Sequence, residues 1–224
     1  MAFTSFSSLS QVIKKYQIKY VEELFHAFKI RKASEVLQQD ITFTLQNVAY
    51  DISESAICEN LIYPILKAVW RPFSKELAIW SHQPIAFAEE LSGIPDYLIS
   101  RRSELGKIVL DYPLLAVVEV KKNDFKAGWA QCGSEMYAIQ QLNKEPNQRV
   151  FGIVSNGETW EFAQLMQNTF TFFTQRYDIQ ELDVLYSALE TVYQFSLGGV
   201  SWFSLCYFRG RYPHTTIVGK QLKE

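Results

Sequence analysis

Two acidic residues and a lysine lie at the ends of apolar stretches, in a pattern that suits a divalent cation. Asp96 follows Pro95, and Glu119 and Lys121 end the apolar run 114–118. Side chains alternate between the two faces of a strand, so Glu119 and Lys121 point the same way. Placing charges at the end of a buried strand is unfavourable unless they bind something. Mg²⁺ takes oxygen ligands, commonly one or two carboxylates with phosphate and water, so this set predicts metal-assisted hydrolysis.

Two short strands are needed to bring these groups together. The unbroken apolar run 114–118 is too short for a helix and predicts a buried strand. Pro95 disfavours helix in the residue before it, so 97–100 is expected to be a second strand. If the two strands pair as a hairpin across the loop 101–113, Asp96 and Glu119 lie near the same end of the sheet.

This arrangement resembles the signature of a known group, the PD-(D/E)XK nuclease superfamily. The signature here is Pro95-Asp96, followed by Glu119-Val120-Lys121 at the end of an apolar strand. The superfamily includes many restriction endonucleases, resolvases and repair nucleases, and the resemblance covers roughly residues 53–161. It implies a restriction endonuclease-like core, with a central mixed β-sheet flanked by helices.

The resemblance also implies a role for each matching residue. Asp96 and Glu119 would hold Mg²⁺, for which Mn²⁺ can substitute, and Lys121 would orient the attacking water or stabilise negative charge. Glu59 matches a glutamate on the helix before the sheet and would be a further metal ligand or a supporting group. Gln131 matches a glutamine on the helix after the lysine and would position the nucleotide or a water.

One position departs from a branch of the superfamily. RecB-like members tend to place a tyrosine four residues after the glutamine, and here that position is Glu135, with Tyr137 two residues later. Gln131 and Glu135 share a side of the predicted helix because they are four residues apart.

A purely structural interpretation competes with the catalytic one. A Pro-Asp pair is usually a turn that leads into a strand, and a Glu-x-Lys pair is usually a surface ion pair worth about 0–1 kcal/mol. Their joint occurrence at the ends of two apolar strands favours a DNA nuclease as the first hypothesis. The second hypothesis is a catalytically inactive relative that acts as a nucleic-acid-binding or protein-interaction module.

The composition predicts one core of ordinary size and a modest electrostatic attraction for nucleic acid. The chain has 224 residues, of which 48% are hydrophobic, and a net charge of −2. A protein that holds long duplex DNA mainly by charge is usually more basic. Bound metal and a local basic cluster are expected to compensate; the cluster comprises Arg101, Arg102, Lys121, Lys122 and Lys126.

The cysteines and the apolar segments indicate a cytoplasmic protein without a membrane span. Cys58, Cys132 and Cys206 form no CxxC motif, so structural zinc is not predicted, and free thiols suit a reducing compartment. The first ten residues lack the features of a signal peptide, and no window of about twenty apolar residues occurs.

The remaining pattern predicts an α/β layout in three parts: a helical extension over 1–50 that packs on the core or forms a homodimer surface, a nuclease-like core over 51–200, and a tail over 201–224. Pro64 is expected to kink or break the third helix, and Asn156-Gly157 predicts a hairpin turn. The helices are expected at 9–30, 34–48, 53–70, 124–143 and 181–195, and the further β segments at 76–90, 150–155, 159–166 and 169–177.

Overall fold

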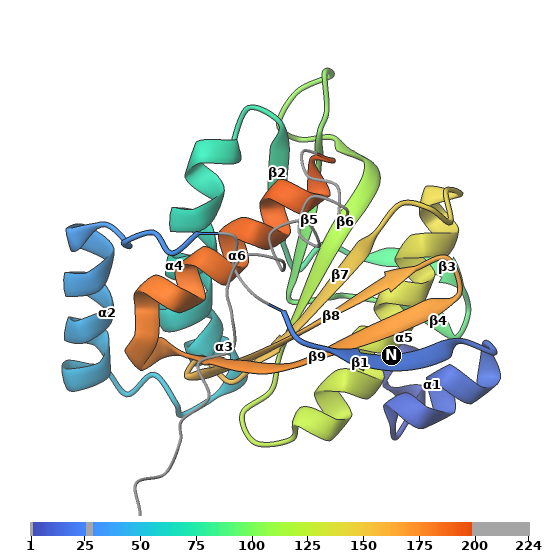
Figure 1. Ribbon diagram of the computed structural model, residues 1–224, viewed down its shortest axis with the longest axis horizontal. Coiled ribbons are helices and arrows are strands. Elements are labelled where there is room, and N and C mark those ends of the chain that lie inside the picture. Colours follow the sequence, from blue (N-terminus) through green and yellow to red (C-terminus); the bar gives the residue numbers. More distant parts are fainter. Residues whose placement is uncertain (1, 26–28, 199–224) are drawn as a thin grey trace, which may run out of the picture.

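A mixed sheet of seven strands forms the centre of the molecule (Figure 1). The computed structural model describes residues 2–25 and 29–198. The strand order is β1-β9-β8-β7-β6-β5-β2, with β1–β9 and β6–β7 parallel and the other neighbours antiparallel. The strands are β1 (Lys19–Glu23), β2 (Leu77–Ser81), β5 (Tyr97–Arg102), β6 (Leu110–Val120), β7 (Val150–Ser155), β8 (Thr159–Met166) and β9 (Thr169–Asp178).

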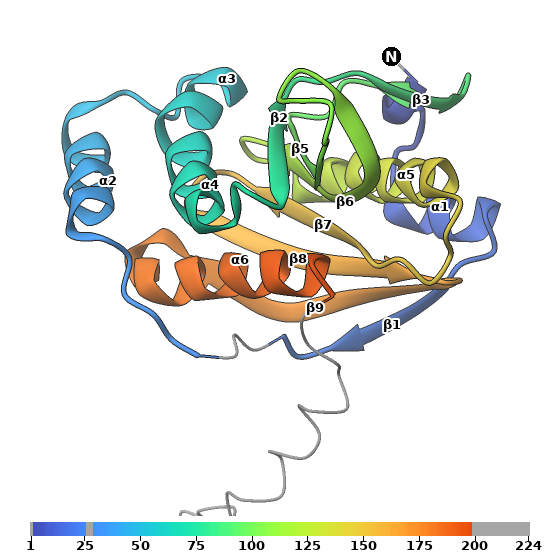
Figure 2. The same cartoon turned by 90° about the horizontal axis from the view of Figure 1, so that it is seen from above.

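Helices flank the sheet, which confirms the predicted α/β layout (Figure 2). One hydrophobic cluster joins the sheet to the side chains of α2, α4 and α6, and the other joins it to α1 and α5. The helices are α1 (Leu9–Lys15), α2 (Glu35–Asn47), α3 (Glu54–Ile57), α4 (Tyr63–Trp70), α5 (Phe125–Asn143) and α6 (Leu182–Ser196). Short helical turns are η1 (Ala2–Ser5), η2 (Cys58–Ile62, a π turn), η3 (Arg71–Phe73) and η4 (Ile179–Glu181).

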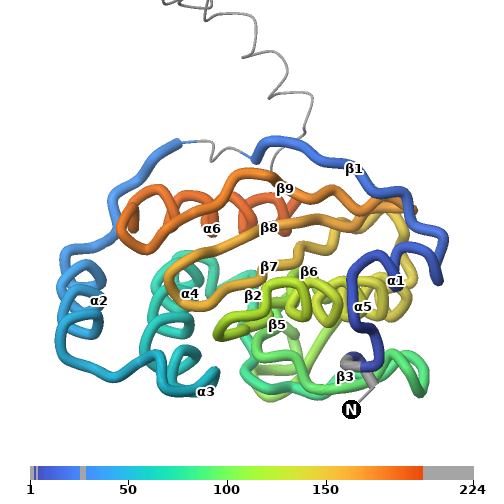
Figure 3. Tube along the Cα trace, turned by 90° about the horizontal axis from the view of Figure 1, so that it is seen from below, coloured from blue at the N-terminus to red at the C-terminus, as the bar shows by residue number. Residues whose placement is uncertain are grey.

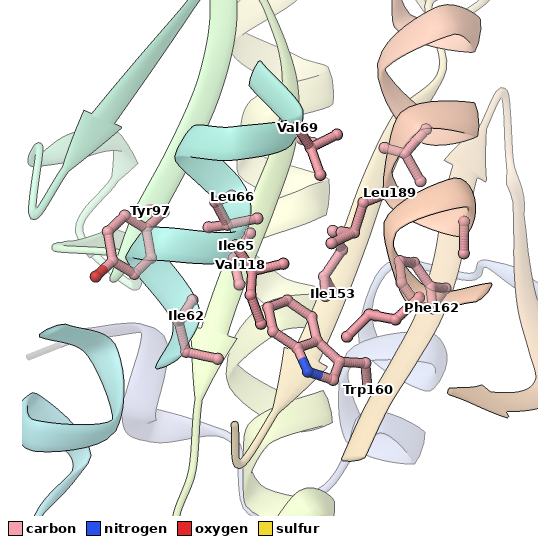
Figure 4. Packing of buried hydrophobic residues seen from close by; sticks show 14 of the residues in the cluster. Ile62, Ile65, Leu66, Val69, Tyr97, Val118, Ile153, Trp160, Phe162 and Leu189 are labelled. Atoms are coloured by element: carbon pink, nitrogen blue, oxygen red, sulfur yellow. The ribbon is translucent and has the colours of Figure 1, made fainter. Parts of the chain in front are cut away.

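The core between the sheet and α4 and α6 holds the middle strands in place (Figure 4). Trp160, Ile153 and Val118 come from three strands, and Ile65 and Leu189 come from the two helices; all five are fully buried. Burying an apolar side chain of this size contributes about 1.5–3 kcal/mol. The ends of β5 and β6 therefore project from a rigid base.

The predicted hairpin between β5 and β6 is confirmed. Tyr97 pairs with Val118, and Ile99 pairs with Ala116, in an antiparallel ladder. The predicted loop 101–113 is partly wrong, because β6 already begins at Leu110. The hairpin is therefore longer than expected on the side away from Asp96.

The predicted helix 9–30 is wrong beyond its first two turns. The helix α1 ends at Lys15, Gln17 has a left-handed backbone with φ of 54°, and β1 follows. β1 pairs in parallel with β9, which it covers at the edge of the sheet (Figure 3). An open sheet edge gains hydrogen bonds from an added strand, and this tertiary pairing outweighs the local helical pattern.

The predicted break in helix 53–70 is confirmed. Ser53 caps α3 by accepting a hydrogen bond from the Ala56 amide. The π turn η2 then leads into α4, in whose first turn Pro64 lies. Proline has no N–H and its ring clashes with the preceding turn, and the wider π turn relieves both problems.

The expected β segment 76–90 divides between two sheets. β2 pairs with β5 in the main sheet, whereas β3 (Ile85–Ala88) pairs with β4 (Leu91–Gly93) in a small separate sheet. His82, with φ of 51°, turns the chain between them. The other predicted helices and strands agree with the structure to within two residues. The tail 201–224 lies outside the described residues.

Candidate active site at the end of the hairpin

The strand register brings His82, Asp96 and Glu119 side by side. Tyr97 pairs with Val118, so Asp96 stands beside Glu119 one position beyond that pair. Ser81 pairs with Tyr97, so His82 stands beside Asp96 on the other side, and the His82 amide donates to the Asp96 carbonyl at 2.9 Å. The neighbouring strands β2, β5 and β6 thus place three polar side chains in one row at the same end of the sheet.

Asp96 is held by the backbone of the neighbouring strand. Its Oδ2 accepts a hydrogen bond from the Val120 amide at 2.8 Å, and its Oδ1 lies 3.7 Å from Nε2 of His82. Burial raises the pKa of Asp96 above its ordinary value, against the opposing effect of the Val120 amide and the nearby cations. The Val120 amide fixes the direction of the carboxylate, whose Oδ1 faces His82.

Glu119 is buried without adequate compensation for its charge. The residue is only 1% exposed, and its Oε2 lies 3.4 Å from Nζ of Lys121. Its Oε1 has no hydrogen-bond donor among the described residues. Burial, followed by repulsion from Asp96, raises the pKa of Glu119 to about 7. A cation bound at this point would oppose both effects and favour the ionised form of Glu119.

Glu135, which the sequence interpretation did not assign to the site, lies behind Glu119. It is fully buried on α5, and its Oε1 accepts a hydrogen bond from Nε2 of Gln131 at 3.1 Å. Its Oε2 has no donor among the residues described here. Burial and the neighbouring Glu119 carboxylate raise the pKa of Glu135 well above its ordinary value. A protonated Glu135 can donate a hydrogen bond to Glu119 and so fix that carboxylate.

Lys121 lies between two glutamates beneath α5. Its Nζ is 3.4 Å from Glu119 and 3.8 Å from Glu54. Burial alone would lower the pKa of Lys121, but the two glutamates raise it above its usual value. Gly128 permits the close approach of α5, because an added Cβ would lie 3.0 Å from Cγ of Lys121. The lysine is therefore charged and confined to one place.

The structure brings Glu54, rather than Glu59, into contact with the basic groups of the site. Oε1 of Glu54 accepts from the Lys122 amide at 3.3 Å, and Oε2 faces Lys121. Glu59 is exposed on η2, and within 2–25 and 29–198 no hydrogen bond or ion pair joins it to Asp96 or Glu119. A π turn holds an extra residue, so the face on which Glu59 lies does not follow from a regular helical period.

Gln131 joins the site indirectly. It was expected to contact a nucleotide or a water, and its amide group instead donates to Glu135. The chain of contacts runs from Gln131 to Glu135 and from Glu135 to Glu119. The helix after the lysine thus supports the carboxylate from behind.

The prediction that Arg101 and Arg102 belong to a basic cluster at the site is wrong. Arg101 and Arg102 end β5, whereas Asp96 precedes its start, so the arginines lie five and six positions from Asp96 along the strand. At about 3.3 Å per residue this is roughly 17–20 Å. Arg101 donates to the Leu197 carbonyl and Arg102 to the Ser74 carbonyl. Lys121 and Lys122 lie at the site, where both contact Glu54.

The donor set suits a hard divalent cation, although the protein supplies few ligands. Within the described ranges, no three His, Cys, Asp or Glu side chains form a complete metal-binding group. Asp96 and Glu119 nevertheless offer carboxylate oxygens at the same end of β5 and β6, and Oε1 of Glu119 is buried without a donor in the described part of the chain. Mg²⁺ often retains several waters and binds through one or two carboxylates plus phosphate oxygens. The residues present fit that mode of binding.

Comparison with known proteins gives no relative from which a function could be transferred. No family model matches the chain, and a search of curated proteins finds no match. No helix among the described residues has the length and apolar character needed to cross a membrane.

Proposed function

We propose that this protein is a metal-dependent nuclease with a restriction endonuclease-like core, which hydrolyses phosphodiester bonds in DNA. One observation carries the proposal: two carboxylates, one of them buried, and a charged lysine meet at the same end of β5 and β6. Holding two carboxylates together in a partly buried place is unfavourable unless a cation offsets their charge, so the arrangement suggests a bound cation. The resemblance to the PD-(D/E)XK signature supports the same conclusion.

In this proposal Asp96 and Glu119 hold Mg²⁺, or Mn²⁺ in its place. The bound metal would supply a Lewis acid for the phosphate and lower the pKa of a coordinated water. The Val120 amide orients Asp96, and Glu135 orients Glu119 from behind. A cation held by Asp96 and Glu119 would offset their repulsion and favour the ionised form of both.

Lys121 has the role of stabilising negative charge on the reacting phosphate. Its ammonium group is part-buried, with a 19% exposed side chain, and carries its proton at neutral pH because its pKa is raised. A fixed cation in a partly dry site stabilises developing charge more strongly than one in water. The same group is able to orient the attacking water.

The test is cleavage of supercoiled plasmid DNA with Mg²⁺ or Mn²⁺ by the wild type and by Lys121→Ala. We expect the wild type to nick the plasmid and the variant to lose roughly 10²–10³-fold in rate while keeping its circular dichroism spectrum. Lys75→Ala, which changes an exposed lysine just before β2 at the opposite end of the sheet, is the matched control. Equal cleavage by wild type and Lys121→Ala would indicate a contaminating nuclease or a different site.

The second candidate is a nucleic-acid-binding or protein-interaction module that does not hydrolyse its partner. The incomplete metal-ligand set within the described residues and the net charge of −2 favour it. Tight DNA binding without hydrolysis across a range of divalent metals would support this function. A homodimer remains a prediction, and sedimentation analysis in the absence and presence of DNA would test it.

A further inference from the structure

A partly exposed aromatic ring lies close to the candidate active site. Tyr63, the first residue of α4, is 36% exposed. Its ring stacks on that of Tyr97, with centroids 6.0 Å apart and planes inclined by 13°. Tyr97 follows Asp96 directly in the chain and packs on the α4 side of the sheet, so the ring pair lies on that side of the strand end at which Asp96 stands.

The lower ring of this pair is fixed. Tyr97 is 2% exposed, its hydroxyl donates to the Cys58 carbonyl at 3.1 Å, and its ring lies at the margin of the core beside Ile62 and Leu66 (Figure 4). Tyr63 therefore rests on a rigid surface rather than on a mobile side chain. A ring held in place in advance loses little freedom when a ligand stacks on it.

A lysine lies against one ring of the pair and a histidine against the other. Nζ of Lys67, about one helical turn after Tyr63, is 5.6 Å from the centroid of the Tyr63 ring. The ring of His82 is 6.1 Å from that of Tyr97, and His82 is the residue that stands beside Asp96. His82 is held in its left-handed backbone conformation by its amide hydrogen bond to Asp96 and by a contact of Nδ1 with Oγ of Ser81 at 2.8 Å.

We propose that Tyr63, Lys67 and His82, here called the aromatic rim, bind an unpaired base next to the phosphate that is cleaved. The substrate class is then single-stranded nucleic acid or an unpaired end, and this inference rests on the proposed nuclease function. Aromatic side chains stack on bases, and nearby cations attract the backbone, in proteins that bind single strands. In a duplex the faces of a base are covered by its neighbours, and exposing them requires a few kcal/mol.

The mild acidity of the chain agrees with this substrate class. A net charge of −2 gives little general attraction for the phosphates of a long duplex. Stacking depends on the faces of the bases and not on phosphate neutralisation, so a few contacts at the rim can supply binding that charge does not. Local attraction then comes from Lys67 and from Lys121 and Lys122 near the metal ligands.

The experiment is fluorescence anisotropy with an end-labelled single-stranded oligodeoxynucleotide and with the blunt duplex of the same sequence, in EDTA so that no cleavage occurs. We expect the wild type to bind the single strand more tightly than the duplex. Tyr63→Ala should weaken single-strand binding roughly 5- to 100-fold and change duplex binding little. Tyr63→Phe should bind like the wild type, because the ring and its stacking surface remain.

A matched control and a second variant protect the test against a folding defect. Phe43, on α2, is an exposed aromatic residue at 60%, and Phe43→Ala should bind like the wild type. Lys67→Ala should weaken binding less than Tyr63→Ala and reduce the dependence of log Kd on log salt concentration. Thermal unfolding of each variant establishes that it is folded before binding is compared.

The outcomes separate this inference from the proposed function. Normal cleavage with single-strand binding unchanged in folded Tyr63→Ala would overturn the aromatic rim and leave the nuclease proposal standing. Single-strand binding that needs Tyr63, without cleavage in any divalent metal, would support the rim as a binding surface and overturn the nuclease proposal. Tighter binding of the duplex by the wild type would also overturn the rim.

Discussion

Two buried glutamates on the same face of the sheet have opposite environments. Glu119 pairs with Val154, and Val154 pairs with Glu161, so the two glutamates lie in one row across β6, β7 and β8. Oε1 of Glu161 is 2.7 Å from Nε of Arg176, and its Oε2 accepts from Nε1 of Trp129 at 2.6 Å. Glu119 has one contact at 3.4 Å and one oxygen without a donor among the described residues.

The difference teaches how to separate a structural carboxylate from a functional one. Glu161 has a fixed partner for each oxygen, as buried charges in stable cores generally do. Glu119 stands instead beside Asp96, which repels its negative charge, and its other neighbour is a second carboxyl group, that of Glu135. Burial is nearly equal at the two positions, 1% and 3%, so the distinction lies in the partners. An exchangeable cation would complete the environment of Glu119.

Neutralising the two glutamates one at a time should give the largest contrast. We expect Glu119→Gln to lower the rate of DNA cleavage by at least about 10²-fold, because a ligand of the metal loses its charge. Glu161→Gln should keep most of the activity, since the amide still accepts from Trp129. Initial rates of plasmid nicking measure both effects. A greater loss in Glu161→Gln than in Glu119→Gln would reverse the assignment.

For stability the order should be reversed: changing Glu161 should lower the free energy of unfolding more than changing Glu119. Glu161→Ala removes two charge-assisted hydrogen bonds and leaves the indole N–H of Trp129 without its acceptor, so we expect a loss of about 1.5–3 kcal/mol in unfolding free energy. Metal-free Glu119→Gln should be at least as stable as the wild type above pH 7, because a buried charge disappears. Urea unfolding in EDTA gives both values, and a marked loss in Glu119→Gln would contradict the comparison.

The contrast between the two glutamates also shows how far the sequence allows prediction. The hairpin that carries Asp96 and Glu119 was predictable because an apolar run and a proline are local signals. The predicted helix 124–143 is also confirmed, as α5. Glu135 could not be recognised in the same way, since its position behind Glu119 depends on how α5 packs on a strand.

The first strand and the helix glutamate illustrate the same limit. β1 exists because the edge of β9 is open to pairing, and nothing within residues 19–23 specifies that partner. Glu59 and Glu54 could not be distinguished because the π turn η2 changes the helical phase between Ser53 and α4. Long-range pairing and helix irregularity therefore account for the incorrect or incomplete predictions.

Binding of Mg²⁺ should depend on pH. The pKa of Glu119 is raised from 4.5 to about 7 in the folded protein, so the folded state binds more protons than the unfolded state between these values. The metal-free protein should therefore lose stability as the pH rises from about 4.5 to about 7. At pH 8, Mg²⁺ at about tenfold its Kd should restore about 1.4 kcal/mol, or about 3–6 °C in Tm.

Thermal scans at pH 6 and pH 8, with Mg²⁺ and with EDTA, measure this linkage. The increase in Tm should be larger at pH 8, because protons compete with the cation for Glu119 at pH 6. Glu119→Gln should abolish the difference between the two pH values, whereas Glu161→Gln should retain it. An equal increase at both pH values in the wild type would place the cation elsewhere.

The smallest expected effect concerns the exposed glutamate that faces Lys121. Glu54→Gln removes a partly exposed contact of 3.8 Å, and such pairs contribute about 0–1 kcal/mol. We expect little change in stability, because Lys121 retains its closer contact with Glu119. Activity should change by only a few fold, since the side-chain oxygen of the new glutamine can still accept from the Lys122 backbone N–H and keep α3 in place.

Glu59→Gln is the matched control and should behave as the wild type in plasmid nicking. If Glu59→Gln instead abolished cleavage and Glu54→Gln did not, Glu59 would be the functional glutamate of this segment. The site would then contain a third functional carboxylate beside Asp96 and Glu119.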